Sequence, residues 1–151
     1  MATTIAPEAH EHVVHLKVSW ATYETLVADT GDDRHALLSY DGETLELMAP
    51  HADHEAHKTL VEALLDILVI EWDFNLYGTG STTIKAEPVG AEPDTSYYIG
   101  NAINVGYLAK IELGTNPPPD LVVEIDMSRS RMDKFALYAT IGVPEFWRID
   151  R

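Results

Sequence analysis

The sequence contains no cysteine, which excludes disulfide bonds and thiolate metal sites and favours an intracellular, cytoplasmic protein. No stretch approaches about eighteen uninterrupted apolar residues, so we expect neither a membrane span nor a membrane partner. The N-terminus also lacks the basic start and apolar centre of a signal peptide. What is present is a chain of 151 residues with 46% hydrophobic content, which suits one domain with a sizeable core.

Cations are also scarce in this sequence. It has 10 lysines and arginines against 25 acids, which gives a net charge of −15. Such a charge repels nucleic-acid phosphates and argues against tight nonspecific binding. No helix-turn-helix, zinc-finger or basic-patch pattern is present to read a nucleotide sequence. Any nucleic-acid substrate is therefore expected to bind weakly or with the help of a partner.

The most informative stretch is Pro117–Ser128, with the sequence PPPDLVVEIDMS. Its prolines exclude a helix, and the β-branched run that follows is typical of a buried strand. Because side chains alternate along a strand, Glu124 and Asp126 share one face beside a core. Neighbouring carboxylates repel, and a strand keeps them when they face water, meet a cation or hold a proton. Two interpretations stay open: an edge strand with solvated acids, and a metal or acid/base site.

Residues 1–18 are predicted to form a flexible arm that precedes a single domain over residues 19–151. His10, His12 and His15 lie at spacings of two and three within this arm. Such spacing can bind a metal ion adventitiously, but a solvated tail is the interpretation we prefer.

A helix and a hairpin are expected after the arm. Ser19 can cap a helix over Trp20–Ala28. The turn signal Asp41-Gly42 predicts a hairpin. Its two strands are expected at His35–Tyr40 and Glu43–Met48. Glu46 faces away from its apolar neighbours, so we weigh a solvent-facing position for it against a place in a pocket.

The longest periodic segment predicts a helix over His54–Trp72, with Asp53 as its N-cap and an apolar face that packs on a sheet. His51, His54 and His57 fall near its first turn. Spacing of three is a weak metal signal, so an all-histidine site is disfavoured. His54 is instead considered as one polar wall of a shared pocket.

The remaining segments are expected to alternate between strands, a turn and one helix. In chain order these are an irregular strand at Leu76–Lys85, a turn at Val89–Pro93, a strand at Asp94–Ile99, a helix at Ser130–Ile141 and a buried strand at Phe146–Asp150. Ser130 is expected to cap the helix, and Phe135 and Tyr138 belong to the apolar face that is expected to pack on the sheet. The interpretation of Val105–Leu113 stays open between helix and strand.

Five runs carry a family resemblance, namely SWATYETL, DGETLELMAPHADHE, GSTTIKAEP, EPDTSYYI and the segment from PPPDLVVEIDMS to EFWRID. The chain strongly resembles the Uma-two family of putative restriction endonucleases over nearly everything from Ser19 to Asp150. That family is assigned to the PD-(D/E)XK nuclease superfamily. The resemblance implies an α/β, restriction-endonuclease-like core with a central mixed β-sheet flanked by helices, preceded by a short helix and a β-hairpin. It also implies a Mg²⁺-dependent endonuclease that hydrolyses nucleic-acid phosphodiester bonds.

Carried over residue by residue, the resemblance implies that Asp94 and Glu124 are catalytic acids and ligands of Mg²⁺ or Mn²⁺. The family's usual lysine lies two residues after the second acid, where this chain has Asp126. The nearest basic candidate is Lys134, either as a migrated catalytic lysine within about 4 Å of a Glu124 or Asp126 oxygen or as a solvated helix residue. Because two acids repel, loss of Asp94 or Glu124 is expected to leave the metal-free stability unchanged or higher.

Glu46 and His54 match recurrent motif positions of the family and, with Asp126, form an expected secondary pocket. Family members usually continue for several strands beyond the position of Arg151, which suggests a shortened form. The aspartate at the usual lysine position favours an alternative, a catalytically inactive nuclease-fold protein that acts as an interaction module. A different metal-dependent hydrolase is a third hypothesis, and a homodimer is left open as an assembly state.

Overall fold

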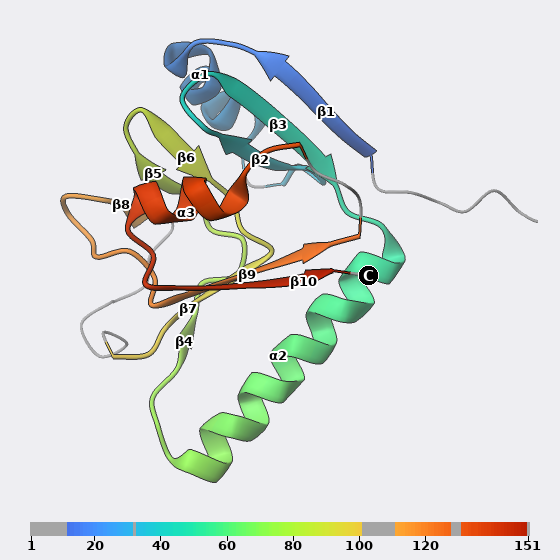
Figure 1. Ribbon diagram of the computed structural model, residues 1–151, viewed down its shortest axis with the longest axis vertical. Coiled ribbons are helices and arrows are strands. Elements are labelled where there is room, and N and C mark those ends of the chain that lie inside the picture. Colours follow the sequence, from blue (N-terminus) through green and yellow to red (C-terminus); the bar gives the residue numbers. More distant parts are fainter. Residues whose placement is uncertain (1–11, 32, 101–110, 128–130, 151) are drawn as a thin grey trace, which may run out of the picture.

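The computed structural model describes residues 12–31, 33–100, 111–127 and 131–150. Within these ranges the chain forms two mixed β-sheets and three helices (Figure 1). In spatial order, the six-stranded sheet contains β1 (His12–Lys17), β3 (Thr44–Ala49), β2 (Leu37–Tyr40), β6 (Val89–Ala91), β5 (Ile84–Ala86) and β8 (Ile111–Glu112). The four-stranded sheet contains β10 (Glu145–Asp150), β9 (Leu121–Asp126), β7 (Thr95–Tyr98) and β4 (Tyr77–Gly78). The expected mixed α/β class is therefore confirmed, and the strands divide between two mixed sheets where one central sheet was expected.

Strand β1 lies where a flexible arm was expected. It pairs antiparallel with β3 at the edge of the six-stranded sheet, with His15 opposite Glu46. The pairing supplies backbone hydrogen bonds that sequence patterning did not indicate, so the prediction of an arm is wrong for His12–Lys17. Residues 1–11, with His10, lie outside the described residues.

Helix α1 (Trp20–Thr30) and the hairpin of β2 and β3 agree with the local signals. The hydroxyl of Ser19 caps the helix by accepting a hydrogen bond from the Thr22 amide at 3.2 Å. Tyr23 is buried in a cluster of α1, β2 and β3 that also contains Leu38. Because side chains alternate, Glu46 points to the opposite side of the sheet from this cluster.

The segment predicted as a turn at Val89–Pro93 instead contains the buried strand β6. Gly90 has no side chain because a Cβ there would lie 2.4 Å from the Tyr23 hydroxyl. Gly90 therefore allows β6 to pack closely against Tyr23 of α1. In the sequence alone, a glycine in this position is easily interpreted as a turn residue. The predicted irregular strand at Leu76–Lys85 also divides, because β4 and β5 belong to different sheets.

Helix α2 (Ala52–Trp72) packs on the four-stranded sheet through Val61 and Leu65. Its N-cap residue is His51, which makes no capping side-chain bond, so the prediction of Asp53 as N-cap is wrong. Part of the apolar stripe faces outward, with Ile70 78% exposed. No helix among the described residues is both long and apolar enough to cross a membrane.

Strand β9 is an internal strand, with β7 on one side and β10 on the other. Its side chains alternate between the core beneath α3 (Lys134–Ile141), which contains Val122, and the core beneath α2, which contains Val123. The interpretation of a solvated edge strand is therefore wrong, and α2 and α3 cover opposite faces of the four-stranded sheet (Figure 1).

Helix α3 begins later than predicted. Asp133 caps it by accepting a hydrogen bond from the Ala136 amide at 3.0 Å, and Gly142 ends it in a left-handed conformation. The proposed cap Ser130 lies outside the described residues. Phe135 was expected on the packed face but is 69% exposed, because the packed face is formed by Leu137, Tyr138 and Ile141.

Candidate active site

Two adjacent strands bring the predicted acids together. Strands β7 and β9 are antiparallel and pair Thr95 with Val123, a register that places Asp94 opposite Glu124. Both residues are buried, with exposed fractions of 1% for Asp94 and 7% for Glu124. Burial raises the pKa of Glu124, and the negative charge of Asp94 adds to the rise. The pairing of β7 with β9 thus brings together two acids that are thirty residues apart in the sequence.

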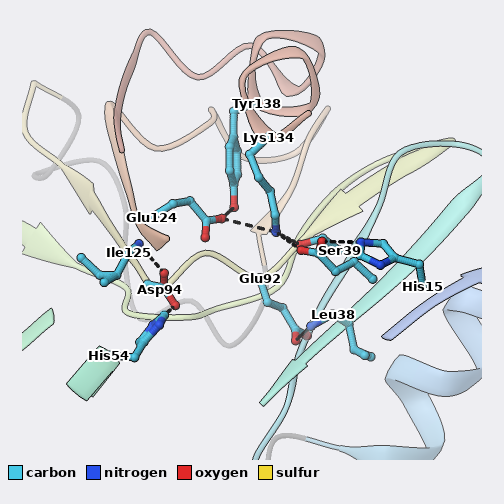
Figure 2. A network of polar contacts seen from close by, with 11 residues as sticks. His15, Leu38, Ser39, His54, Glu92, Asp94, Glu124, Ile125, Lys134 and Tyr138 are labelled. Carbon is cyan, nitrogen blue, oxygen red and sulfur yellow. Dashed lines mark hydrogen bonds and ion pairs between the residues drawn. The ribbon is translucent and has the colours of Figure 1, made fainter. Parts of the chain in front are cut away.

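Asp94 is held by two hydrogen bonds. His54 from α2 lies 2.7 Å from its Oδ1 through Nε2, and the amide of Ile125 donates to its Oδ2 at 2.7 Å (Figure 2). His54 is fully buried, and its place as a polar wall of a shared pocket stays a prediction. The two bonds fix the Asp94 carboxylate against both α2 and β9.

The carboxylate of Glu124 lies under α3. Tyr138 donates a hydrogen bond to its Oε1 at 2.5 Å, and the Nζ of Lys134 lies 3.7 Å from the same oxygen (Figure 2). Burial raises the pKa of Glu124 to about 7, with Asp94 adding to the rise while Lys134 and the Tyr138 hydrogen bond oppose it. Near neutral pH this carboxyl therefore exchanges between its protonated and ionised forms.

Lys134 is the first residue of α3, and its side chain is only 15% exposed. Its Nζ lies 3.1 Å from Glu46 Oε1 and 2.6 Å from the hydroxyl of Ser39. Burial acts to lower the pKa of Lys134, but the charges of Glu124 and Glu46 overcome that effect and raise it. The ammonium is therefore charged, and its nearer carboxylate is Glu46. Because Lys134 is shared between Glu46 and Glu124, its positive charge balances the negative charge of Glu124 only in part.

A second layer of polar contacts reaches the surface through Glu46. Glu46 is 2% exposed, and its Oε2 lies 2.8 Å from His15 Nε2 on β1. The solvent-facing interpretation of Glu46 is wrong because α3 covers this side of the six-stranded sheet and supplies Lys134. Sequence reasoning missed His15 and Tyr138 as parts of this network. The spacing of Lys134 and Tyr138, four residues apart on one helix, was the available signal for the latter.

Asp126 points to a different partner. Its Oδ2 lies 2.8 Å from Arg148 Nη2 on β10, the strand that runs parallel to β9. Asp126, which stands where the family pattern has its lysine, thus forms an ion pair with Arg148. The ammonium group near Glu124 is that of Lys134 on α3. Of the other histidines near α2, His57 is exposed and its Nδ1 contacts the Asp53 carbonyl at 2.7 Å.

This arrangement is accompanied by a family match. The Uma2 family model, described as "Putative restriction endonuclease", matches residues 20–151. The chain belongs to the Uma2 family. Its structure is also similar to the crystal structure of a putative nuclease belonging to DUF820 from Anabaena variabilis, with a TM-score of 0.62 and 15% identity over 88% of this chain and 74% of that chain. At this identity the likeness shows the fold alone. No curated protein matches the sequence.

In this Uma2 protein the donor set suits a hard divalent cation only in part. Among the described residues, no group of three or more histidine, aspartate or glutamate side chains is arranged to hold a metal ion. Mg²⁺ is nonetheless commonly held by one or two carboxylates, with water and substrate phosphate completing its shell. Asp94 and Glu124 supply two such carboxylates, and the contacts from Tyr138 and Lys134 both go to one oxygen of Glu124. The fit is partial because both oxygens of Asp94 already accept hydrogen bonds, from His54 and the Ile125 amide, so a cation would share them.

Glu124 borders a cleft of about 600 Å³ between β3, β9, β10 and the start of α3, whereas Asp94 lies behind Glu124 and does not line it. Its polar lining includes Glu46, Glu124 and Lys134. Its apolar lining includes Met48 and Phe146. A volume of this size is typical of sites for small ligands or parts of larger ones, about 300–1,000 Å³.

Proposed function

We propose that the protein is a metal-dependent nuclease that hydrolyses phosphodiester bonds with Asp94, Glu124 and Lys134. The observation that carries this proposal is the 3.7 Å approach of Lys134 Nζ to Glu124 Oε1. The lysine comes from a helix and not from the strand position that the family pattern uses, yet it reaches the same carboxylate. Membership of a family described as putative restriction endonucleases supports the same reaction class.

Each residue then has a distinct task. Asp94 and Glu124 would hold Mg²⁺ or Mn²⁺, which when bound polarises the phosphate and lowers the pKa of a water molecule. Lys134 presents a fixed positive charge at the border of the cleft, where it can stabilise negative charge that develops on phosphate oxygens. Because Glu46 and Ser39 also hold Lys134, little reorganisation is needed during reaction. This arrangement assigns ligation to the strands and charge stabilisation to α3.

The alternative is a catalytically inactive member that acts as an interaction module. Asp126 supports it, because this acid stands at the usual lysine position and pairs with Arg148. The two functions differ in what Lys134 does. In the module Lys134 balances buried acids, and its loss affects only folding; in the nuclease its loss removes cleavage from a folded protein.

Cleavage of plasmid DNA, single-stranded DNA and RNA, with Mn²⁺, Mg²⁺ or EDTA, tests the proposal. We expect metal-dependent cleavage that Glu124→Gln and Lys134→Ala both abolish. Mn²⁺ titration followed by electron paramagnetic resonance should show weakened binding in Glu124→Gln and retained binding in Lys134→Ala. The controls Glu43→Gln and Lys17→Ala break an exposed ion pair outside the site and should cleave as the unmodified protein does. Absence of cleavage by a folded, Mn²⁺-binding protein, or full cleavage by Lys134→Ala, would contradict the proposed mechanism.

A further inference from the structure

The cleft gathers cations in a chain that has few of them. Arg131, Lys134 and Arg148 all line it, which is three of the chain's 10 lysines and arginines. The same lining holds four of the 25 acids, namely Glu46, Glu124, Asp126 and Asp133. The local charge is thus close to balance, whereas the whole chain carries −15. An anionic ligand meets less repulsion here than the overall charge indicates.

The acids of the cleft already have local partners. Glu46 contacts Lys134 and His15, and Asp126 contacts Arg148. Asp133 accepts the capping hydrogen bond of α3. The ion pairs of Arg148 with Asp126 and Asp150 use its Nη2 and Nε atoms, and a guanidinium has five N–H donors. Arg148 is 55% exposed, so further donors can reach a phosphate.

An aromatic side chain stands on the same lining. Phe135 is 69% exposed, although its helix neighbours Leu137 and Tyr138 are buried. Its ring centroid lies 6.5 Å from that of Phe146, in an edge-to-face arrangement at 61°. The edge contact supports the Phe135 ring from one side while much of the side chain stays in contact with solvent. Such a ring offers a stacking surface next to Lys134, its neighbour in sequence.

Resting on the proposed nuclease function, we propose that the cleft takes single-stranded nucleic acid, with an unpaired base stacked on Phe135 and the neighbouring phosphates held by Arg131 and Arg148. A base in a duplex is stacked on its neighbours and cannot present its face to Phe135. Stacking also does not depend on net charge, and contributes about 1–3 kcal/mol per base. Duplex binding, by contrast, depends on many phosphate contacts, which 10 cations in a chain of net charge −15 cannot supply.

Binding without cleavage tests the substrate class directly. Fluorescence anisotropy in EDTA at physiological salt should show that labelled single strands of DNA or RNA bind more tightly than the matched duplex. Phe135→Ala should weaken single-strand binding by about 5- to 150-fold, the equivalent of one lost stacking contact. Phe135→Trp should retain it, because the larger ring stacks equally well. Trp72→Ala, which removes a 70% exposed aromatic residue on α2 outside the cleft, is the matched control and should bind normally.

The outcomes separate this inference from the proposed function. Glu124-dependent cleavage that prefers duplex, or that Phe135→Ala leaves unchanged, overturns the single-strand inference and leaves the nuclease proposal intact. Phe135-dependent binding of single strands without metal-dependent cleavage contradicts the nuclease and keeps the binding site. If Phe135→Ala instead dissociates a dimer seen by sedimentation and no strand binds, the ring serves a protein interface and the inference is wrong.

Discussion

Two buried glutamates, Glu92 and Glu124, are both drawn in Figure 2 and have opposite surroundings. Glu92 is 2% exposed and has a full set of donors. Arg34 forms a salt bridge with it, the hydroxyl of Thr83 donates to Oε1 at 2.7 Å, and the amide of Leu38 donates to Oε2 at 2.8 Å. This carboxylate joins the loop after α1 to β2 and to Thr83, the residue before β5, and its negative charge is locally balanced.

Glu124 has fewer compensating contacts for a similar burial. Tyr138 donates one hydrogen bond, Lys134 lies nearer to Glu46 than to Glu124, and Asp94 adds a second negative charge. Burial raises its pKa to about 7 as a consequence. Residues with such perturbed pKa values cluster at functional sites, whereas a satisfied carboxylate such as Glu92 is structural. The comparison therefore distinguishes a glutamate that stabilises the fold from one that the fold holds at a cost.

The largest expected effect comes from the structural glutamate. Glu92→Gln leaves Arg34, whose side chain is only 13% exposed, without its carboxylate. Removal of one partner of a buried ion pair costs about 3–5 kcal/mol. We expect a loss of that size in the free energy of unfolding by urea denaturation at pH 7. A change below about 1 kcal/mol would show that the Arg34–Glu92 pair is not the stabilising contact that its burial indicates.

Glu124→Gln should act in the opposite direction. The folded pKa of about 7 lies above the ordinary value of 4.5, so the folded state holds this proton more tightly than the unfolded chain does. The contribution of Glu124 to stability is therefore favourable below about pH 4.5 and is lost as pH rises through 7. We expect the metal-free variant to match the unmodified protein near pH 4.5 and to exceed it at pH 8 by roughly a few kcal/mol.

Thermal unfolding at several pH values measures this difference. The gain of Glu124→Gln should grow between pH 4.5 and 7 and then level off. A variant that is less stable than the unmodified protein at pH 8 would mean that the ionised Glu124 is a net stabilising group. Glu43→Gln, which changes an exposed glutamate, should show no such dependence on pH.

Sequence identified the features that depend on neighbouring residues. Ser19 and the Asp41-Gly42 turn act through backbone groups a few residues away, and the helix and hairpin they predict are present. Apolar alternation in β9 likewise placed Val122 and Val123 on opposite faces. Signals of this kind are local, so one sequence is enough to read them.

Features that depend on distant partners were missed or misread. Gly90 looked like part of a turn because its contact with Tyr23 joins two segments far apart in the chain. Glu92 was not singled out, since Arg34 lies 58 residues away. The late start of α3 was missed because Asp133 competes with Ser130 as a cap in the same stretch of sequence. The family pattern directed attention to Lys134, the nearest basic residue after Asp126. Its approach to Glu124 could then be anticipated because α3 is the next element after β9 in the chain.

A smaller loss is expected from Asp94→Asn. Charge repulsion alone predicts that the metal-free protein is unchanged or more stable, but Asp94 accepts bonds from both His54 and the Ile125 amide. An asparagine offers one acceptor oxygen, so one of these buried donors loses its partner at a cost of about 1–3 kcal/mol. Urea denaturation in EDTA should show this loss. Increased stability of Asp94→Asn would instead show that repulsion outweighs the two hydrogen bonds.

The smallest expected change tests how finely α3 controls Glu124. Tyr138 is fully buried, and its ring lies 5.3 Å from Phe146, so Tyr138→Phe keeps the packing and removes only the hydroxyl. In the unmodified protein the hydrogen bond from Tyr138 lowers the pKa of Glu124. Its removal should therefore raise that pKa from about 7 to a higher value. The stability loss should then be about 1 kcal/mol at pH 5 and about 2 kcal/mol at pH 8, where the bond is to a charged group.

Tyr98→Phe is the matched control for Tyr138→Phe, because the buried Tyr98 hydroxyl donates to the Pro117 carbonyl at 2.7 Å, an acceptor that does not titrate. Its stability loss should be the same at both pH values. In the double variant Glu124→Gln with Tyr138→Phe, the pH-dependent part of the Tyr138 effect should vanish. If it persists, a group other than Glu124 titrates beneath α3, and the contrast with Glu92 loses its electrostatic basis.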